Sequence, residues 1–194
     1  MAIRTVIQIG HPSLKAKNKQ LSSFTSPKMK QLINDLKDTM YDAGLIGIAA
    51  PQIAENYSLF ITHARNTKAR NLGKEDILRI FINPQLISQS KEKTIVYEGC
   101  GSVSETKIFG PVERSKEILI EALDENGTKF SLTCDGILAR VILHEYDHLH
   151  GIEFIQKVKD YNKIISEEYY VKDIKSSNRQ LSASTITKVD YKKF

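Results

Sequence analysis

Two histidines and a glutamate near residue 145 have the types and the spacing of a metal-binding hydrolase site. The segment His144–His148 reads HEYDH and lies in a stretch with helical periodicity. Positions i and i+4 of a helix lie on one face, so both imidazoles can reach one metal ion. Glu145 points to the side, where it can act as general base on a water bound to that metal.

The alternative interpretation of these residues is a surface helix that carries two ordinary histidines. Ile137 and Val141 precede His144 at helical spacing, and both histidines continue this apolar stripe. Paired histidines on a buried face, with a carboxylate beside them, need a partner that stabilises them. A metal ion is such a partner, so the pattern favours a metal site.

The third protein ligand of this metal has two candidates. Cys100 lies between two glycines in Glu98–Ser102 (EGCGS), where the backbone can turn a thiol toward a metal. A free cysteine is also commonly a small buried hydrophobe. Glu168 follows His148 by twenty residues, a distance at which some zinc proteases place a helical glutamate. Spacing alone does not choose between them.

The elements around the histidine helix predict an α+β fold. Asp135–His150 is the expected metal-binding helix, and a second helix is expected to begin at Pro27. Lys116–Leu123 and Thr128–Thr133 predict a hairpin around an Asn-Gly turn. Further expected strands are Thr5–Ile9, Tyr57–Thr62, Arg79–Asn83 and Gln85–Ser90. Because strands precede the helix in blocks, we expect antiparallel β-sheets packed around a central helix that carries HExxH.

The C-terminal part predicts one more helix and then a tail. Asp160–Ile174 has a mixed amphipathic pattern, and the chain from Ser176 onward is rich in Ser, Thr and Lys, which is typical of loose structure. We see no internal repeat and no linker that would divide domains. The expected organisation is a single catalytic domain over residues 1–175, followed by a polar basic tail over residues 176–194.

Composition narrows the class of protein. The 194 residues are 41% hydrophobic and 26% charged, which is typical of a globular domain. No apolar run approaches the roughly 20 residues of a membrane helix. Two cysteines are too few for a disulfide-built secreted domain. We therefore expect a cytoplasmic protein of a reducing compartment, with no membrane partner.

The net charge of +5 is concentrated at the two ends of the chain. Residues 1–34 hold six basic side chains and no acid, and residues 177–194 carry a net charge of +3. A nucleic-acid groove would need basic residues clustered with aromatic ones, so no specific DNA binding is expected. We interpret the ends as solvated, with weak attraction to the ribosome as the alternative.

Three segments together resemble the peptide deformylase family. They are Gly47–Gln52 (GIAAPQ), Glu98–Ser102 and His144–Gly151 (HEYDHLHG). Their order and approximate separation fit that family, as do His11–Leu14 and the pair Asn83-Pro84. The resemblance runs from about residue 4 to about residue 160.

The resemblance implies roles for named residues. One divalent metal would be bound by three protein ligands, which are Cys100, His144 and His148. Glu145 would be the general acid and base, and Gln52 and the backbone N–H of Gly101 would stabilise the oxyanion. The family favours Fe2+ in the cell and tolerates Zn2+ or Ni2+. It removes the formyl group from N-terminal formylmethionine of newly made polypeptides and releases formate, so formylated nascent peptides are the implied partners.

The same resemblance implies where substrate binds and where this chain departs. The implied substrate-binding residues are Ile46, Gly47, Val96, Gly99, Ile137, Arg140 and Val141. The family usually has Gly at Leu45, Leu at Gly101, Gln at Leu143 and an apolar residue near Arg140. The side chain of Leu45 would obstruct the close approach of the substrate backbone. Arg140 stands beside the methionine pocket, so its guanidinium must reach an acid, which an acidic substrate could supply, or extend along its stem to solvent.

We therefore expect a metal-dependent amidohydrolase of the deformylase type. Two alternatives stay open. One is a zinc endoprotease that uses Glu168 as its third ligand. The other is a catalytically weak, deformylase-like protein that binds nascent chains, ribosomes or another partner.

Overall fold

The structure of the chain is a computed structural model, which describes residues 2–24, 26–67, 70 and 72–194. The helices are α1 (Pro27–Asp42), α2 (Gly136–Leu149), α3 (Glu167–Tyr169) and α4 (Asn178–Ser184). The strands are β1 (Gly47–Ala49), β2 (Leu59–Thr62), β3 (Arg79–Gln89), β4 (Lys93–Glu98), β5 (Ile108–Ser115), β6 (Glu117–Leu123), β7 (Lys129–Asp135), β8 (Ile165–Ser166) and β9 (Val189–Lys193). Among these residues, none of the helices has the length and apolar character needed to cross a bilayer.

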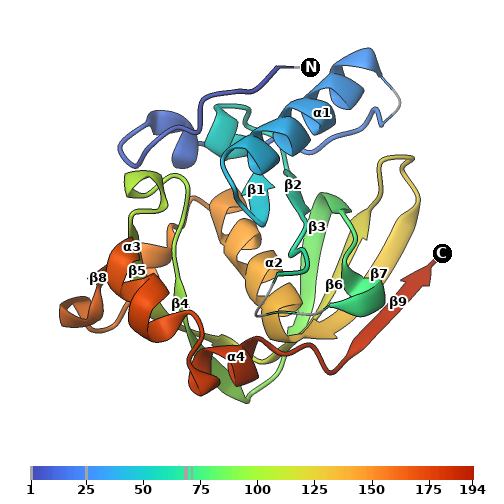
Figure 1. The fold of residues 1–194 in the computed structure, drawn as a ribbon. Coiled ribbons are helices and arrows are strands. Elements are labelled where there is room, and N and C mark those ends of the chain that lie inside the picture. Colours follow the sequence, from blue (N-terminus) through green and yellow to red (C-terminus); the bar gives the residue numbers. More distant parts are fainter. Residues whose placement is uncertain (1, 25, 68–69, 71) are drawn as a thin grey trace.

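Helix α2 lies between two antiparallel sheets (Figure 1). In the described part of the chain, one sheet has the strand order β1-β2-β3-β6-β7-β9, and the other has the order β4-β5-β8. The expected hairpin is confirmed, since β6 and β7 pair from Glu117 opposite Asp135 to Leu123 opposite Lys129. The expected α+β class, with antiparallel sheets around a central helix, is confirmed as well.

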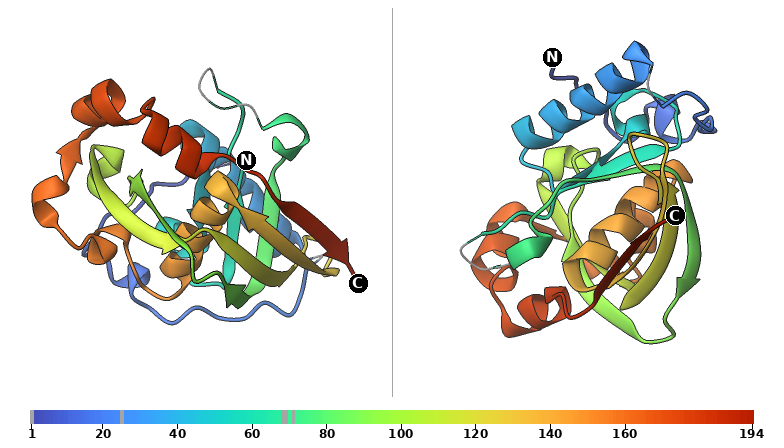
Figure 2. Two further views of the ribbon diagram at one scale, coloured as in Figure 1. Left: turned by 90° about the horizontal axis from the view of Figure 1, so that it is seen from below. Right: turned by 90° about the vertical axis from the view of Figure 1, so that its right-hand side faces the viewer.

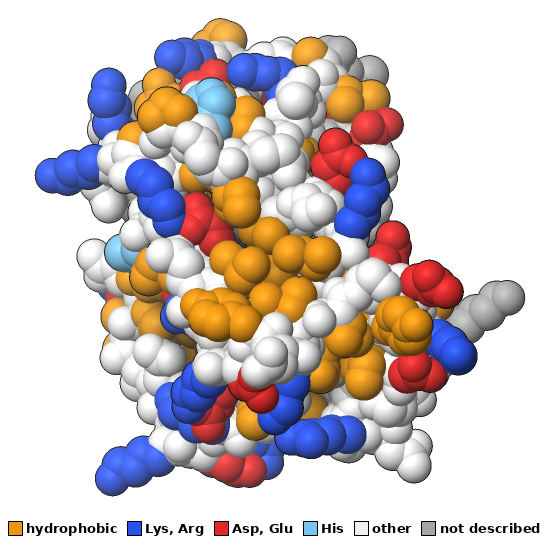
Figure 3. All heavy atoms as spheres, turned by 90° about the vertical axis from the view of Figure 1, so that its left-hand side faces the viewer, with side chains coloured by type: hydrophobic (Ala, Val, Ile, Leu, Met, Phe, Trp, Pro, Cys, Tyr) orange, Lys and Arg blue, Asp and Glu red, His pale blue; other side chains and the backbone are white. Residues whose placement is uncertain are grey.

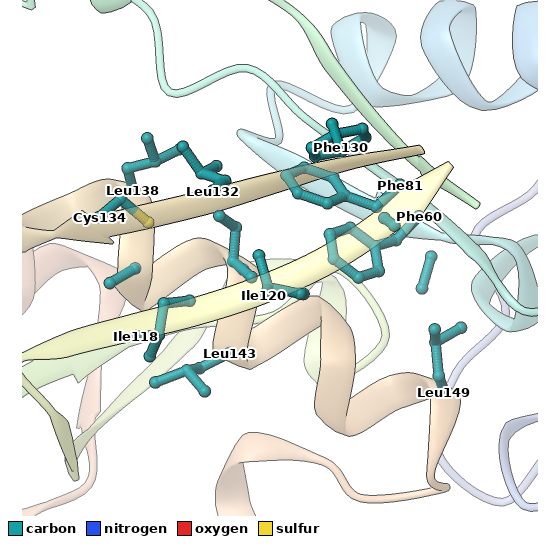
Figure 4. Close-up of a cluster of buried hydrophobic side chains, with 14 residues drawn as sticks. Phe60, Phe81, Ile118, Ile120, Phe130, Leu132, Cys134, Leu138, Leu143 and Leu149 are labelled. Carbon is teal, nitrogen blue, oxygen red and sulfur yellow. The ribbon is translucent and has the colours of Figure 1, made fainter. Parts of the chain in front are cut away.

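The larger sheet buries a different helix on each face. On β2, Leu59 and Ile61 pack with α1, whereas Phe60 between them packs with the α2 side. This division follows from the two-residue alternation of side chains along a strand. Phe60 stacks on Phe81 with ring centroids 4.6 Å apart. Figure 4 shows these aromatic rings and the aliphatic side chains of β6 and β7 against α2, so the helix that carries the histidines is fixed by a dense apolar core.

Several expected strands differ in detail. Arg79–Asn83 and Gln85–Ser90 form a single strand, β3, whose register shifts between Ile82 and Gln85, where Pro84 supplies no N–H. Residues 5–9 join no sheet. This extended segment instead donates hydrogen bonds to the backbone of two of the sequence segments described above, those that contain Gln52 and Ser102. Ile7 donates to the Gln52 carbonyl at 2.9 Å and Ile9 to the Ser102 carbonyl at 2.8 Å.

The prediction of one helix over Asp160–Ile174 is wrong. Tyr161–Lys163 is a short 3-10 turn, Ile165 pairs with Phe109 of β5, and helical structure resumes only at Glu167, as α3 and then a π-helical turn over Tyr170–Ile174. The β-branched pair Ile164-Ile165 favours extended structure. Pairing with β5 therefore outweighs the amphipathic helical pattern.

The prediction of a loose tail after residue 175 is also wrong. Residues 178–184 form α4, and β9 runs along β7 at the sheet edge (Figure 2). Val189 packs on the main core cluster and Tyr191 lies against Phe130, with ring centroids 5.2 Å apart. The carboxylate of Asp135 accepts hydrogen bonds from the backbone N–H groups of Thr187 and Lys188. Two apolar residues within this Ser/Thr/Lys-rich segment, together with the carboxylate of Asp135 on β7, therefore order it.

Candidate metal centre and substrate cleft

The side chains of Cys100, His144 and His148 face one another. One ligand atom from each lies within 4.8 Å of the others, and the Cys100 Sγ lies 3.2 Å from the His148 Nε2. The two imidazole rings are one helical turn apart on α2, with centroids at 5.0 Å. Glu168 is exposed and is not part of this group. The geometry therefore favours Cys100 over Glu168 as the third donor.

Glu98 fixes the orientation of His144. Its Oε2 lies 2.9 Å from the His144 Nδ1, which leaves Nε2 to face the cluster. Arg114 holds the same carboxylate in a fork, with Nε to Oε1 at 2.7 Å and Nη2 to Oε2 at 2.9 Å. Burial alone would raise the pKa of Glu98, but Arg114 and His144 hold it well below its usual range. Glu98 is thus a buried anion throughout the ordinary pH range.

Asp147 acts on this network through Arg114. Its carboxylate accepts from the Arg114 Nη1 at 2.5 Å and from the Lys157 Nζ at 2.9 Å. Its partners are therefore these two cations. The chain Asp147–Arg114–Glu98–His144 links two carboxylates through one guanidinium to a metal-binding ring.

Arg140 is paired inside the protein. Its Nη1 donates to the Glu98 Oε1 at 2.8 Å and to the Val112 carbonyl at 3.0 Å, and its Nη2 donates to the Thr94 carbonyl at 2.9 Å. The residue is only 5% exposed, so of the two alternatives for Arg140 the one in which it extends to solvent is wrong. The acid that it reaches belongs to the chain itself. Arg140 therefore does not need a carboxylate from the substrate.

Glu145 is one of two residues, with Thr62, that have a buried polar side-chain atom without a hydrogen-bond partner among the described residues. It is 3% exposed, and its Oε2 is buried with no hydrogen-bond partner among the described residues. Burial raises its pKa to about 7. Buried carboxylates are almost always satisfied. An unsatisfied one beside two histidines and a thiol is placed to exchange protons with a molecule in the cleft.

Gly47 allows β1 to approach Glu145. A Cβ at this position would lie 2.5 Å from the Glu145 Oε1 and 2.7 Å from the Val141 Cγ1. Real side chains do not pack at such distances, so only glycine fits between this strand and α2. The glycine of the segment Gly47–Gln52 therefore leaves the space that the Glu145 carboxylate occupies.

Gln52 is fixed beside the thiol. Its Oε1 accepts from the Ala49 N–H at 2.8 Å, and its Nε2 lies 3.2 Å from the Ser102 Oγ and 3.6 Å from the Cys100 Sγ. The amide is 1% exposed, so these bonds assign its orientation. Its Nε2 is therefore held next to the metal-ligand cluster.

Two of the departures from the family pattern occupy the same space. A Cβ on Gly101 would lie 2.9 Å from the Leu45 Cδ1. The leucine side chain therefore comes from position 45, where the family usually has glycine, and the glycine stands at 101, where the family usually has leucine. The two departures compensate each other sterically. Leu143, the third, is buried in the main core cluster.

A cavity of about 560 Å³ opens beside the cluster. Every residue that the sequence suggested for substrate binding lines it, and these are Ile46, Gly47, Val96, Gly99, Ile137, Arg140 and Val141. Gln52, Cys100, Gly101, His144 and Glu145 line it as well. Sequence reasoning missed the opposite side of the opening. That side includes Arg65, Arg70, Tyr170, Lys175, Gln180, Leu181 and Ile186, which lie outside the recognised segments.

The residues present fit a divalent transition metal. A thiolate and two imidazoles are donors suited to Zn2+ or Fe2+. Burial, together with the nearby His144 and Arg114, lowers the pKa of His148 well below its usual range, which keeps the ring in the neutral form that binds metals. Three converging donors and one unpartnered carboxylate define a metal-dependent hydrolase of the HExxH type.

Comparison with known proteins identifies the family. The family model described as polypeptide deformylase matches residues 3–163. A peptide deformylase of Christiangramia forsetii is 36% identical over 98% of this chain and 94% of its own length. The chain therefore belongs to the polypeptide deformylase family, whose members are metal-dependent enzymes that remove N-formyl groups from nascent peptides.

Two further relatives bear on the function. A Staphylococcus aureus protein called peptide deformylase-like is 34% identical over 89% of this chain and all of its own length. A class I type b peptide deformylase from Acinetobacter baumannii, solved with Met-Ala-Ser bound, superposes with a TM-score of 0.74 at 28% identity. That structure covers 81% of this chain, and this chain covers 99% of it.

Proposed function

We propose that this chain removes the formyl group from N-terminal formylmethionine of newly made polypeptides and releases formate. The observation that carries the proposal is the unpartnered, buried Oε2 of Glu145 beside the cluster of Cys100, His144 and His148. The family membership supports the same reaction.

The three donors would hold one divalent metal. When bound, such a metal acts as a Lewis acid and lowers the pKa of water toward about 7. We propose Fe2+ as the cellular metal, with Zn2+ or Ni2+ as substitutes, because a thiolate donor makes the site softer than a third imidazole would.

The chain's own residues carry the proton and the developing charge. Glu145 accepts a proton from the water that attacks the formyl carbon, and later gives it to the amine that leaves as the C–N bond breaks. The Gln52 Nε2 and the N–H of Gly101 donate to the formyl oxygen as it becomes negative. One such donor is typically worth about 3 kcal/mol.

The cavity orients the first residue of the peptide. Val96, Ile137 and Val141 present apolar surface next to the catalytic carboxylate, which suits a methionine side chain. Strand β1 at Gly47 and the loop at Gly99 flank the space in which the formylated backbone would lie. Holding the formyl carbon close to Glu145 makes the attack effectively intramolecular.

We also propose a cytoplasmic location and a weak attraction to the ribosome. Newly made polypeptides emerge in the cytoplasm. The basic ends are paired only in part: Arg4 pairs with Asp35, Lys188 with Glu117, and Lys193 with Asp124. Lys17, Lys19 and Lys30 form no ion pair with a described residue. On the face in Figure 3, basic and acidic side chains are interspersed around a central group of hydrophobic ones, so this face is not uniformly basic.

Formate release from formyl-Met-Ala-Ser tests the proposal. The protein is prepared without oxygen and loaded with Fe2+, and formate is measured with a coupled dehydrogenase. We expect repeated turnover that chelation of the metal abolishes. Acetyl-Met-Ala-Ser is the matched control, and cleavage of internal peptide bonds would instead support the endoprotease.

Binding of the peptide without formate release would support the deformylase-like alternative. That alternative draws on the name of the Staphylococcus aureus relative and on the departures around the substrate. The compensation between Leu45 and Gly101 weakens it, because the two changes leave the packing of the loop intact.

A further inference from the structure

The mouth of the cleft has two sides that the shared catalytic motifs do not include. One side is the loop that contains Arg65 and Arg70, and the other is the C-terminal wall, which we define as residues 170–186. The C-terminal wall lies after residue 163, where the family match ends. The C-terminal wall therefore lies beyond the part of the chain that the family model matches, whereas Arg65 and Arg70 lie within it.

The C-terminal wall is held rigidly. The side chain of Gln180 bonds the backbone of Tyr97 twice, with Oε1 accepting from its N–H and Nε2 donating to its carbonyl, both at 3.1 Å. Tyr170 stacks on Phe109 with ring centroids 3.9 Å apart and planes at 4°. Ile186 packs in the same small cluster as Ile137 and Val141. The wall is thus ordered before any peptide binds, which lowers the entropic cost of recognition.

Three cations line the mouth, and within the described residues none of them forms an ion pair. They are Arg65, Arg70 and Lys175. Arg65 donates to the Leu45 carbonyl at 2.7 Å and lies 5.4 Å from the centre of the Tyr41 ring. Arg70 donates to the carbonyls of Arg65 and Ala64. Both guanidiniums are oriented by neutral groups and keep their full positive charge.

Among the described residues that line the cavity, no free carboxylate balances these cations. The acids that line the cavity are Glu98, which two arginines hold, and Glu145 at the catalytic end. Burial lowers the pKa of Arg70, as expected for a guanidinium removed from water without an acid. The Asp76 carboxylate opposes this shift from nearby, but it is engaged by the His63 Nε2 at 2.9 Å.

We propose that the mouth selects formylated peptides with acidic side chains shortly after the first residue, through Arg65, Arg70 and Lys175. This inference rests on the proposed deformylase function and names its preferred substrate class. The first residue occupies the apolar end of the cavity, so the following residues pass between the arginine loop and the C-terminal wall. A carboxylate there meets positive charge that the chain itself leaves unpaired.

The test compares isosteric peptides. Formate release is measured for formyl-Met-Asp-Glu and formyl-Met-Asn-Gln, at low and at high salt. An exposed ion pair changes binding by a factor of about 2 to 5, so three cations together predict a preference of about tenfold for the acidic peptide at low salt. We expect the preference to reside in KM and to shrink as the salt concentration rises.

Two variants locate the effect. Lys175→Gln removes an exposed charge and is expected to fold normally, and Arg70→Gln removes a half-buried one. Each should reduce the ratio of kcat/KM between the two peptides by a factor of about 2 to 5. Lys37→Gln is the matched control, because Lys37 is exposed on α1 and does not line the cavity.

The outcomes separate this inference from the proposed function. Equal kcat/KM for the two peptides, or a preference that Lys175→Gln and Lys37→Gln alter alike, would overturn the selection. If neither peptide yields formate, the proposed function fails. Calorimetric binding of unformylated Met-Asp-Glu and Met-Asn-Gln then still decides the inference, since about tenfold tighter binding of the acidic peptide supports it and equal binding refutes it.

Discussion

The cleft has a closed end, which contains the metal-ligand cluster with Glu98, and a mouth. The two differ in whether their charged side chains form ion pairs within the protein. At the closed end, Glu98 is shared by Arg114, Arg140 and His144. Glu98 and the two arginines are buried, and the His144 side chain is only 11% exposed. At the mouth, Arg65 and Lys175 are at least partly exposed and form no ion pair with a described residue. A charge in a buried network has several partners that its removal would leave unsatisfied, whereas a charge at the rim has few.

This difference indicates how the chemistry and the selectivity of the cleft can change separately. The closed end requires particular atoms at particular distances, so most substitutions there are severe. The mouth contributes through charges that act over several ångströms and tolerate movement. Substitutions at the closed end should therefore change kcat, metal content or stability, and substitutions at the mouth should change KM and salt dependence.

The largest effects are expected for the metal donors. Cys100→Ser and His148→Ala should lose the metal and with it nearly all activity, because two donors bind a divalent ion far more weakly than three. Elemental analysis of the purified variants measures this. Glu168→Ala and Cys134→Ser are the controls and should keep one metal per chain. Loss of metal in Glu168→Ala, with Cys100→Ser unaffected, would refute the assignment.

A smaller but still large effect is expected for Gly47→Ala. The new methyl group would lie 2.5 Å from the Glu145 Oε1 and must displace the carboxylate. A displacement of about 1 Å can lower kcat about 100-fold. Gly110→Ala is the control, because its Cβ would meet Val158 at 2.8 Å outside the cavity. The control should lose stability and keep its kcat, and an unchanged kcat in Gly47→Ala would contradict the packing described here.

Arg140→Met should affect stability more than chemistry. The substitution leaves the carbonyls of Thr94 and Val112 without their donor, while Glu98 keeps Arg114. Unsatisfied buried groups of this kind typically cost about 1–3 kcal/mol. Urea unfolding measures the loss. A more stable variant would mean that apolar packing at this position is worth more than the buried ion pair.

The smallest effect is expected from exchanging Leu45 and Gly101. Leu45→Gly leaves a void, and Gly101→Leu overlaps the leucine side chain that is already present. The double variant should recover part of both losses, with a coupling energy of about 1 kcal/mol in a double-mutant cycle of unfolding free energies. Strict additivity of the two single changes would show that the two positions do not compensate.

The catalytic end could be predicted from the sequence because its signals are local. His144 and His148 are one helical turn apart on a helix whose apolar stripe is plain, and the resemblance supplied Cys100 from a distant segment. The rest depends on contacts that no local pattern contains. The acid that pairs with Arg140 is 42 residues away, and the strand at Val189–Lys193 is ordered by β7 and by Asp135.

The strands β4 and β5 show the same limitation. They pair from Lys93 opposite Ser115 to Glu98 opposite Gly110 and carry Glu98 to the metal cluster. Strand β4 begins with exposed Lys93, and two of its three inward-facing residues, Thr94 and Glu98, are polar, so the sequence shows no clear alternation of apolar and polar residues. Their role follows from the three-dimensional arrangement, in which α2 lies between the two sheets (Figure 1).

The central claim is that the closed end performs deformylase chemistry with Glu145 as the group that moves the proton. Its most direct test is formate release from formyl-Met-Ala-Ser by Fe2+-loaded Glu145→Gln beside the unmodified protein, with metal content measured on the same samples. The account predicts one metal per chain in both proteins. It predicts a kcat that is lower in the variant by a factor of about 10² to 10⁴ or more. Near-normal turnover in Glu145→Gln would contradict it.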